Sequence, residues 1–339
     1  MNKCKLLLLI VLTVSLTACF PSNPSNKTEV LLQGRTMGTT YNIKVVSTKE
    51  QVAALNLHQK IDAALKEINQ AMSTYIPDSE LSRFNKSRST EAIEISDGLA
   101  RVMKESLRLG ELSGGKLDVT VGPLVNLWGF GPEQRAEKVP SDELLMKTKA
   151  RIGLQHLHLE GKLLSKSEPD LYVDLSTLAK GYGVDVIAEL IEQQGMTNYL
   201  VEIGGELRLK GFKHTGELWA IAIEKPLTHE RSVQQVIIPK DNAVATSGDY
   251  RIYFEEDGKR FSHIIDPNTG RPIDHNLVSV TVIHPSSMTA DGLSTTLMVM
   301  GMEQGIRFAM ENNIAALFVV KTEHGFDERF TVKFKQYLK

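Results

Sequence analysis

The sequence has 339 residues, of which 42% are hydrophobic and 24% charged, and its formal net charge is −2. This length and composition are ordinary for a globular protein with a substantial core. The nearly balanced charge provides no basic surface of the kind that binds nucleic acid, so nucleic acid is excluded as an expected partner.

The N-terminus predicts a lipoprotein signal peptide at residues 1–18. Lys3 and Lys5 precede an almost wholly apolar run at residues 6–16, which is too short for a membrane-spanning helix. The run ends in Leu-Thr-Ala before Cys19, which resembles the bacterial lipobox, where the cysteine is lipidated and becomes the mature N-terminus. An ordinary signal peptide with a chance cysteine is the alternative.

Residues 19–29 are rich in Pro, Ser and Asn and predict a flexible tether, followed by the folded domain at residues 30–339. The expected location is the membrane, through the lipid anchor, with the domain facing the periplasm or the cell exterior. Because Phe20 and not aspartate follows the cysteine, the outer membrane is favoured over the inner one in a Gram-negative cell.

The elements expected in the first half of the chain are a hairpin at residues 30–46 and helices at residues 52–72, at residues 96–113 and after residue 140. The hairpin is predicted from alternating, β-branched residues, and the helices from apolar residues at helical spacing. Ser96 is expected to begin the second helix, with Ser-Asp-Gly as its start, and Ser141 is the expected cap of the third helix.

The second half is richer in strands. Strands are expected at residues 171–174, 199–203, 218–223, 251–254 and 278–283, with a hairpin turn at residues 256–258. Helices are expected at residues 183–194 and 290–312. Because strands and helices do not alternate regularly, the pattern favours an α+β fold, with a single large body, over a doubly wound sheet.

Asp291 and Thr295 form a candidate metal-binding pair. If Asp291 opens a helix, Thr295 lies one turn further along the same face. A carboxylate and a hydroxyl are hard oxygen ligands of the kind that Mg²⁺ requires. The alternative is that Asp291 only caps the helix or complements its dipole.

Lys180 lies where a hydrophobic strand is expected to run through a turn into a glycine-rich helix start. Such a place exposes backbone groups to a ligand, and a lysine there can bind a phosphate. The glycine spacing is not that of a Walker loop. A solvated lysine at a helix N-terminus is the alternative.

Gly204-Gly205 and His263 are further candidates in the second half. Two glycines within a strand pattern indicate either a structural bulge or the close approach of a flat ligand. His263 is expected late in a strand, where a histidine is either structural or a proton acceptor.

In the first half, Met37 and Tyr75 lie near turns and outside apolar stripes. Each is a candidate to pack on a planar ring, with core filling as the alternative. Residues 116–124 and 127–131 are dense in turn and aromatic residues, which suits the rim of a ligand site.

Together these segments resemble the ApbE-type FAD:protein FMN transferases, in order and over roughly residues 31–305. The matching motifs are RTMGT at 35–39, STY at 73–75, DSELSRFN at 78–85, DVTVGPL at 118–124, LWGFG at 127–131, LAKG at 178–181, GGE at 204–206, ATSGDY at 245–250, HIIDP at 263–267 and ADGLST at 290–295. The lipobox agrees with this resemblance, because many members of the family are lipoproteins.

The resemblance implies an FAD site in a central cleft and assigns roles to individual residues. It implies that Mg²⁺ is held by the main-chain carbonyl of Thr177 and by the side chains of Asp291 and Thr295, although the family often has a small residue where Thr177 stands. The implied FAD contacts are Met37, Tyr75, Lys116, Leu117, Asp118, Lys180, Gly204, Gly205, His263 and Ile265.

The implied activity is the Mg²⁺-dependent transfer of FMN from FAD to a Thr or Ser hydroxyl of an acceptor protein, with release of AMP. The hydroxyl attacks the FMN-side phosphorus, Mg²⁺ neutralises charge on the pyrophosphate, and His263 accepts the proton. The expected acceptors are periplasmic domains of membrane redox complexes, such as the Na⁺-translocating NADH:quinone reductase or the related Rnf complex.

Two other functions fit the same residues. If water replaces the acceptor hydroxyl, the site acts as a Mg²⁺-dependent FAD pyrophosphatase that releases free FMN and AMP. The second alternative is a non-enzymatic FAD-binding lipoprotein. The set of metal ligands argues against it, because binding alone needs no metal at the scissile bond.

Overall fold

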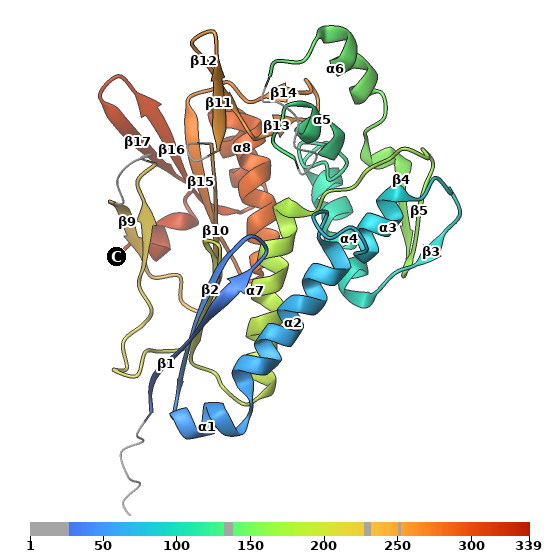
Figure 1. Cartoon of the computed structure of the whole chain (residues 1–339). Coiled ribbons are helices and arrows are strands. Elements are labelled where there is room, and N and C mark those ends of the chain that lie inside the picture. Colours follow the sequence, from blue (N-terminus) through green and yellow to red (C-terminus); the bar gives the residue numbers. More distant parts are fainter. Residues whose placement is uncertain (1–26, 132–137, 227–231, 250–251) are drawn as a thin grey trace, which may run out of the picture.

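The computed structural model describes residues 27–131, 138–226, 232–249 and 252–339 (Figure 1). The predicted signal peptide, Cys19 and most of the tether lie outside these residues, as does Arg251 at the start of one expected strand. The first strand already begins at Thr28, inside the predicted tether. Within the described ranges, no helix has the length and apolar character needed to cross a membrane.

The centre of the fold is an eight-stranded antiparallel sheet in the order β1-β2-β6-β7-β10-β15-β16-β17. Its strands are β1 (Thr28–Thr36), β2 (Thr39–Ser47), β6 (Tyr199–Ile203), β7 (Glu206–Lys210), β10 (Ala243–Gly248), β15 (Leu277–His284), β16 (Ala315–Thr322) and β17 (Gly325–Phe330). Alternate residues of β2 are buried, and Tyr41, Ile43 and Val45 join the main core.

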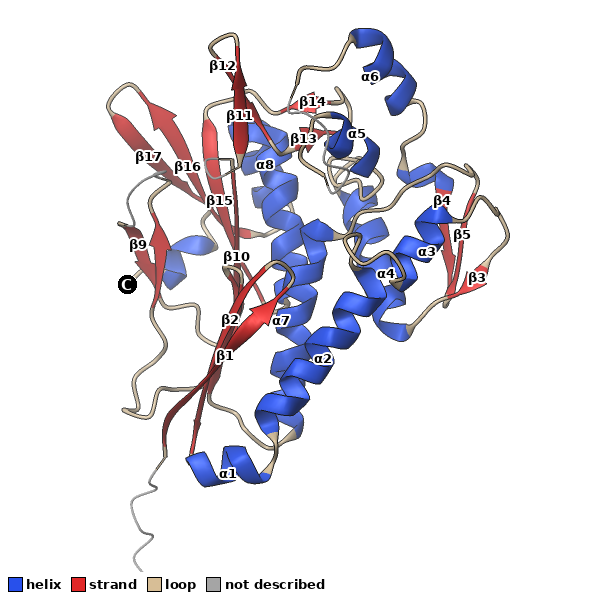
Figure 2. Cartoon of the chain, viewed as in Figure 1, coloured by secondary structure: helices blue, strands red, loops and turns tan. Residues whose placement is uncertain are grey.

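The long helices lie together on one side of this sheet (Figure 2). The helices are α1 (Lys49–Ala54), α2 (Leu57–Met72), α3 (Glu80–Lys86), α4 (Asp97–Leu112), α5 (Gly122–Leu127), α6 (Asp142–Lys149), α7 (Ser176–Gln193) and α8 (Ser287–Glu311), with 3₁₀ turns η1 (Leu154–His156) and η2 (Phe334–Tyr337). Buried residues of α2, α4, α7 and α8 form the main core with those of β2 and β15.

Smaller sheets surround this body: β3 (Ile93–Glu94), β5 (Leu163–Lys166) and β4 (Leu157–Glu160); β8 (Ile221–Glu224) and β9 (Val233–Ile237); β11 (Tyr253–Glu256) and β12 (Lys259–Ser262); β13 (Ile265–Asp266) and β14 (Arg271–Pro272). A second apolar cluster includes Trp219, Phe334 and Tyr337. A third surrounds Trp128, whose Nε1 donates a hydrogen bond of 2.9 Å to the carbonyl of Gly270.

The expected α+β class is confirmed, and so are the elements with strong local signals. Ser96 accepts a hydrogen bond from Leu99 N at the start of α4, and Ser141 accepts one from Leu144 N at the start of α6. The hairpins at residues 30–46 and 256–258 and the strands at residues 199–203 and 278–283 also form.

Two expectations in the first half and middle of the chain are wrong. The helix expected at residues 52–72 is divided into α1 and α2, because Asn56 adopts a left-handed conformation with φ of 49°. Residues 171–174 form no strand, although Leu171 and Val173 are fully buried. The side-chain amide of Asn85 donates to the carbonyl of Val173 and accepts from its backbone N–H. These are the two hydrogen bonds that a neighbouring strand would otherwise make.

Other boundaries shift. β8 begins at Ile221, because Leu218 makes only an isolated bridge with Phe212, and β11 begins at Tyr253. α7 begins at Ser176 and not at residue 183, so the LAKG motif is helical and does not form a turn. α8 begins at Ser287 and contains a non-helical residue at Gly301, where φ is 73°.

Gly181 and Gly183 led to the expectation of a turn, but both lie within α7, where close contacts leave little room for a side chain. A Cβ atom on Gly181 would lie 2.4 Å from the carbonyl oxygen of Ser287, and one on Gly183 would lie 3.0 Å from Cε of Met37. The backbones of α7 and α8 therefore approach each other at Gly181 more closely than any side chain allows.

Replacing Gly181 by alanine tests this contact. A helical Gly→Ala change normally stabilises a protein, but here the new methyl group meets backbone, so we expect the free energy of unfolding to fall by about 1–3 kcal/mol. Gly98→Ala in α4 is the matched control, since its Cβ meets only the hydroxyl end of Tyr182 at 2.9 Å. Equal urea midpoints for both variants would contradict the assignment.

Candidate functional site

The close approach of α7 and α8 brings Asp291 against the first turns of α7. Asp291 is the fifth residue of α8 and only 3% exposed, while Ser286 is the N-cap, so the interpretation of Asp291 as a helix cap is wrong. Its Oδ2 accepts a hydrogen bond of 3.0 Å from the backbone amide of Gly181. The carboxylate is thus fixed by the neighbouring helix.

The carbonyl of Thr177 lies beside the same amide. In an α-helix the N–H of residue 181 points at the carbonyl of residue 177, and here that N–H also contacts Asp291. The carbonyl oxygen and the carboxylate therefore face a common point at the start of α7. The side-chain Oγ1 of Thr177 is buried without a hydrogen-bond partner.

Thr295 lies one helical turn beyond Asp291 and on the same face of α8. Its hydroxyl lies 3.0 Å from Oγ of Ser247 in β10, which in turn lies 2.7 Å from Oγ of Ser294. Asp291 thus lies against the first turns of α7, which hold Thr177, and Thr295 follows one turn along α8. Their joint role as metal ligands stays a prediction.

Lys180 connects this group to the sheet. Its ammonium lies 2.6 Å from Oε1 of Glu206 in β7 and 3.8 Å from Oδ1 of Asp291. Burial alone would lower the pKa of Lys180, but the charges of Asp291 and Glu206 raise it above its ordinary value. Lys180 is therefore a cation that holds two carboxylates together.

Burial raises the pKa of Asp291 to about 7, against the opposing effect of Lys180 and with a further increase from the like charge of Glu206. A carboxylate with such a pKa favours a bound proton or a cation at neutral pH. Perturbed carboxylates of this kind concentrate at functional sites.

Glu206 is a site residue that sequence reasoning missed. Its side chain is 5% exposed, Oε1 accepts from Lys180, and Oε2 is buried without a partner. The signal was its position directly after Gly204-Gly205. These glycines form the turn of the β6–β7 hairpin, with φ of 61° and 106°, so they do not lie within a strand and the bulge alternative is wrong. The close approach of a flat ligand to them stays a prediction.

Two hairpin turns meet at α7. Met37 occupies a left-handed position in the β1–β2 turn, and its side chain packs against Gly183. A Cβ atom on Gly204 would lie 2.8 Å from Cγ2 of Thr39 and 3.4 Å from Cδ of Lys180. Met37, Gly204 and Lys180 thus belong to one neighbourhood.

A second neighbourhood joins residues 116–118 to β13. The ammonium of Lys116 lies 3.2 Å from Oδ2 of Asp266, next to Ile265, which is buried. Leu117 is buried in the main core, so only its backbone is available to a ligand. Burial raises the pKa of Asp118, although its Oδ1 accepts two hydrogen bonds from Thr120.

His263 does not lie within a strand, because β12 ends at Ser262 and β13 begins at Ile265. Its Nδ1 lies 3.0 Å from the carbonyl of Ile252, which can only accept, so Nδ1 carries the proton and Nε2 is the free acceptor of the neutral ring. Burial lowers the pKa of His263, and the charge of Lys180 lowers it further, against the effect of the Ile252 hydrogen bond.

Tyr75 lies in the turn after α2 with 72% of its surface exposed, and its backbone amide donates to Oγ of Ser73. Its contact with FAD stays a prediction, as does the central cleft. The described residues contain no group of three or more His, Cys, Asp or Glu side chains suited to a metal ion. The predicted magnesium site instead combines one carboxylate with two neutral oxygens.

The fold is α+β and the candidate site is a buried cluster of two carboxylates and one ammonium. Comparison with known proteins identifies the family. Residues 37–318 match the model of the ApbE family. The chain is 56% identical over 310 residues to the FAD:protein FMN transferase of Vibrio cholerae, covering 91% of this chain and 93% of that protein. It is 49% identical to the FAD:protein FMN transferase of Haemophilus influenzae, covering 96% and 95% of the two chains.

Solved structures agree. The flavin transferase ApbE from Vibrio cholerae has a TM-score of 0.86 at 55% identity, covering 92% of this chain and 100% of that chain. The apo form of the Pseudomonas stutzeri flavinyl transferase ApbE has a TM-score of 0.85 at 40% identity, covering 92% and 97%. The chain belongs to the ApbE family and is an FAD:protein FMN transferase, which argues against a non-enzymatic FAD-binding lipoprotein.

Proposed function

We propose that the chain transfers FMN from FAD to a Thr or Ser hydroxyl of an acceptor protein in a Mg²⁺-dependent reaction that releases AMP. The observation that carries this proposal is the buried cluster of Asp291, Glu206 and Lys180. When both carboxylates are ionised, the single ammonium of Lys180 leaves the cluster with a net negative charge, which suits a divalent cation in place of the proton on Asp291.

The donor set fits magnesium. Asp291 supplies a charged oxygen, and Thr177 and Thr295 supply neutral ones. The unpartnered buried oxygen of Glu206 adds a further acceptor beside them. These oxygens would hold Mg²⁺, which would supply charge neutralisation for the pyrophosphate. Lys180 and the amide of Gly181 hold the two carboxylates in position before the substrate arrives.

His263 is the proposed general base. Its free Nε2 accepts the proton of the acceptor hydroxyl, whose oxygen forms a bond with the FMN-side phosphorus. The bond between that phosphorus and the bridging oxygen breaks, and AMP leaves with the bridging oxygen and its electron pair. Because burial and Lys180 lower the pKa of the ring, His263 is neutral and ready to accept at pH 7.

Incubation with FAD and Mg²⁺ tests the reaction itself. We expect AMP release to require an acceptor protein, whose mass rises by one FMN moiety on a Thr or Ser residue. The proposed acceptors are periplasmic domains of membrane redox complexes of the Na⁺-translocating NADH:quinone reductase or Rnf type. Rapid release of free FMN and AMP without any acceptor would establish the pyrophosphatase alternative in place of transfer.

The metal site predicts a specific defect for Asp291→Asn. Asparagine keeps the shape and an accepting oxygen for Gly181 N but removes the charge, so the Mg²⁺ concentration for half-maximal transfer should rise by more than roughly 100-fold, since even outer-shell groups contribute 10–100-fold to metal affinity. Thr295→Ser, which retains the hydroxyl, is the control and should change little. An unchanged Mg²⁺ requirement in Asp291→Asn would remove Asp291 from the ligand set.

The lowered pKa of His263 predicts the pH dependence of transfer. The rate should be level near pH 7 and fall at acid pH with a midpoint below 6.5, because only the neutral ring accepts a proton. Single-turnover transfer measured at saturating Mg²⁺ keeps Asp291 ionised and isolates this titration.

His263→Ala should slow transfer by about 10²–10⁴-fold and abolish the acid limb, with FAD affinity little changed. His158→Ala, at an exposed histidine in β4, is the matched control. Parallel loss of FAD affinity, activity and melting temperature in His263→Ala would make His263 a structural residue.

For location, we propose that Cys19 carries the lipid and that the domain faces the periplasm or the cell exterior, at the outer membrane in a Gram-negative cell. The tether after Cys19 supports this proposal, since it would separate the folded domain from the membrane. Fractionation of membranes after carbonate washing, with mass spectrometry of the N-terminal peptide, tests it; an unmodified N-terminus beginning before Cys19 would overturn it.

A further inference from the structure

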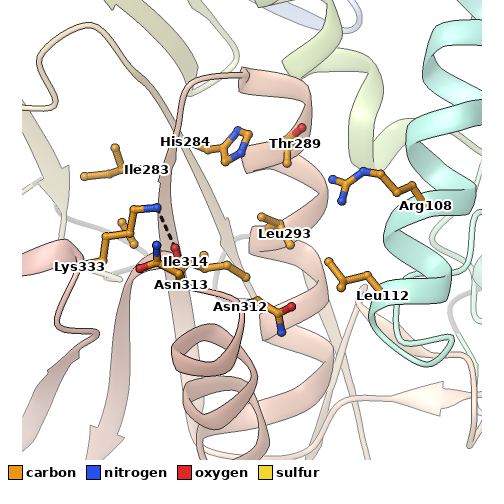
Figure 3. A pocket seen from close by; sticks show the side chains of 11 residues that line it. Arg108, Leu112, Ile283, His284, Thr289, Leu293, Asn312, Asn313, Ile314 and Lys333 are labelled. Atoms are coloured by element: carbon orange, nitrogen blue, oxygen red, sulfur yellow. Dashed lines mark hydrogen bonds between the residues drawn. The ribbon is translucent and has the colours of Figure 1, made fainter.

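A cavity of about 330 Å³ lies between α4, the end of β15, α8 and the segment that precedes η2 (Figure 3). It is separate from the flavin site. Thr289 and Leu293 line the cavity, whereas Asp291 and Thr295 belong to the metal cluster, and residues two positions apart on a helix point in nearly opposite directions. α8 therefore forms a wall between the two sites.

One side of the cavity presents a fixed guanidinium. Nε and Nη2 of Arg108 donate to Glu105 at 2.7 and 2.6 Å, and the hydroxyl of Thr289 donates to the same carboxylate at 2.7 Å. Nη1 makes no hydrogen bond to the described residues. Figure 3 shows the guanidinium of Arg108 pointing toward the cavity.

Lys333 supplies a second cation from the opposite side. Its ammonium donates a hydrogen bond of 2.8 Å to the carbonyl of Asn313 (Figure 3). In the part of the chain that the structure describes, no carboxylate lies within ion-pair distance of Lys333. Arg108 and Lys333 together outweigh the single charge of Glu105, so the cavity retains positive charge.

His284 adds a neutral donor between these cations. Its Nδ1 lies 3.1 Å from the backbone N–H of Ser286, which can only donate, and 3.3 Å from the carbonyl of the same residue, which can only accept. When Nδ1 accepts the shorter of these two hydrogen bonds, the neutral ring carries its proton on Nε2. Burial lowers the pKa of His284, which keeps the ring neutral at pH 7. Groups that can donate hydrogen bonds thus line the cavity on α4, on β15 and on the segment before η2.

The rest of the lining is apolar or amide: Leu112, Leu293 and Ile314 form walls, and the side chain of Asn312 stands beside them. The volume lies at the lower end of the roughly 300–1,000 Å³ that small-molecule sites occupy. Two cations and a third donor from separate directions match the tetrahedral oxygens of a phosphate better than a planar carboxylate.

We propose that this cavity is a binding site for a small organic phosphate monoester, whose phosphate contacts Arg108, His284 and Lys333 and whose body packs against Leu112 and Leu293. The phosphate places negative charge where the protein leaves positive charge uncompensated. The cavity lies on the opposite face of α8 from the predicted metal ligands Asp291 and Thr295.

Calorimetric titration with phenyl phosphate tests this site, because the probe joins a phosphate monoester to a small apolar ring. Lys333→Gln should weaken binding by roughly 10- to 100-fold, as expected for the loss of a hydrogen bond to a charged group. Lys333→Arg retains the charge and should bind within a few-fold of the unaltered protein. Lys335→Gln, at an exposed lysine two residues away, is the matched control and should bind normally.

Asp291→Asn locates the probe, since binding unchanged in this variant assigns phenyl phosphate to the cavity and not to the metal cluster. Absence of binding to the unaltered protein, or equal affinity for the protein with and without Lys333→Gln, would overturn the proposal. Inorganic phosphate or benzoate binding as tightly as phenyl phosphate would likewise overturn the assignment to an organic phosphate monoester. Melting temperatures of all variants, measured alongside, establish that each one is folded.

Discussion

Gly181 lets α7 approach α8 so closely that its amide reaches the carboxylate of Asp291. This one contact determines where the acidic group lies, because a side chain at residue 181 would separate the two helix backbones. It also places the carbonyl of Thr177 and the ammonium of Lys180 beside Asp291, since both belong to the same turns of α7. The sheet then completes the cluster through Glu206, which the β6–β7 hairpin carries to Lys180.

The cluster is electrostatically incomplete on its own. Removing carboxylates from water is costly, and one ammonium cannot compensate two of them fully. Burial accordingly raises the pKa of Asp291 to about 7, and one oxygen of Glu206 is buried without a hydrogen-bond partner. A divalent cation therefore binds more favourably to these buried carboxylates than to carboxylates in water. The free-energy cost of removing the buried carboxylates from water has already been met during folding.

Features that depend on local sequence could be predicted, and features that depend on distant partners could not. The caps Ser96 and Ser141 act on backbone three residues away, so their signals lie within one window of sequence. Residues 171–174 alternate like a strand, but their partner is the side chain of Asn85, which no periodicity reveals. The predicted metal ligands came from the resemblance to the family and not from local sequence patterns. Glu206 was missed because it meets Lys180 only when the β6–β7 hairpin packs against α7.

α8 carries the predicted metal ligands on one face and lines the cavity with the other. Asp185 of α7 holds the first turn of α8 in place. This fully buried carboxylate accepts hydrogen bonds from the hydroxyl of Ser286 and from the amides of Ser287 and Met288, and it pairs with Arg208 of β7. A ligand in the cavity beside α8 would affect the predicted flavin site only if it favoured a second position of this helix. Contacts from α7 and β7 that converge on one carboxylate oppose such a movement of α8, which separates the predicted metal ligands from the cavity.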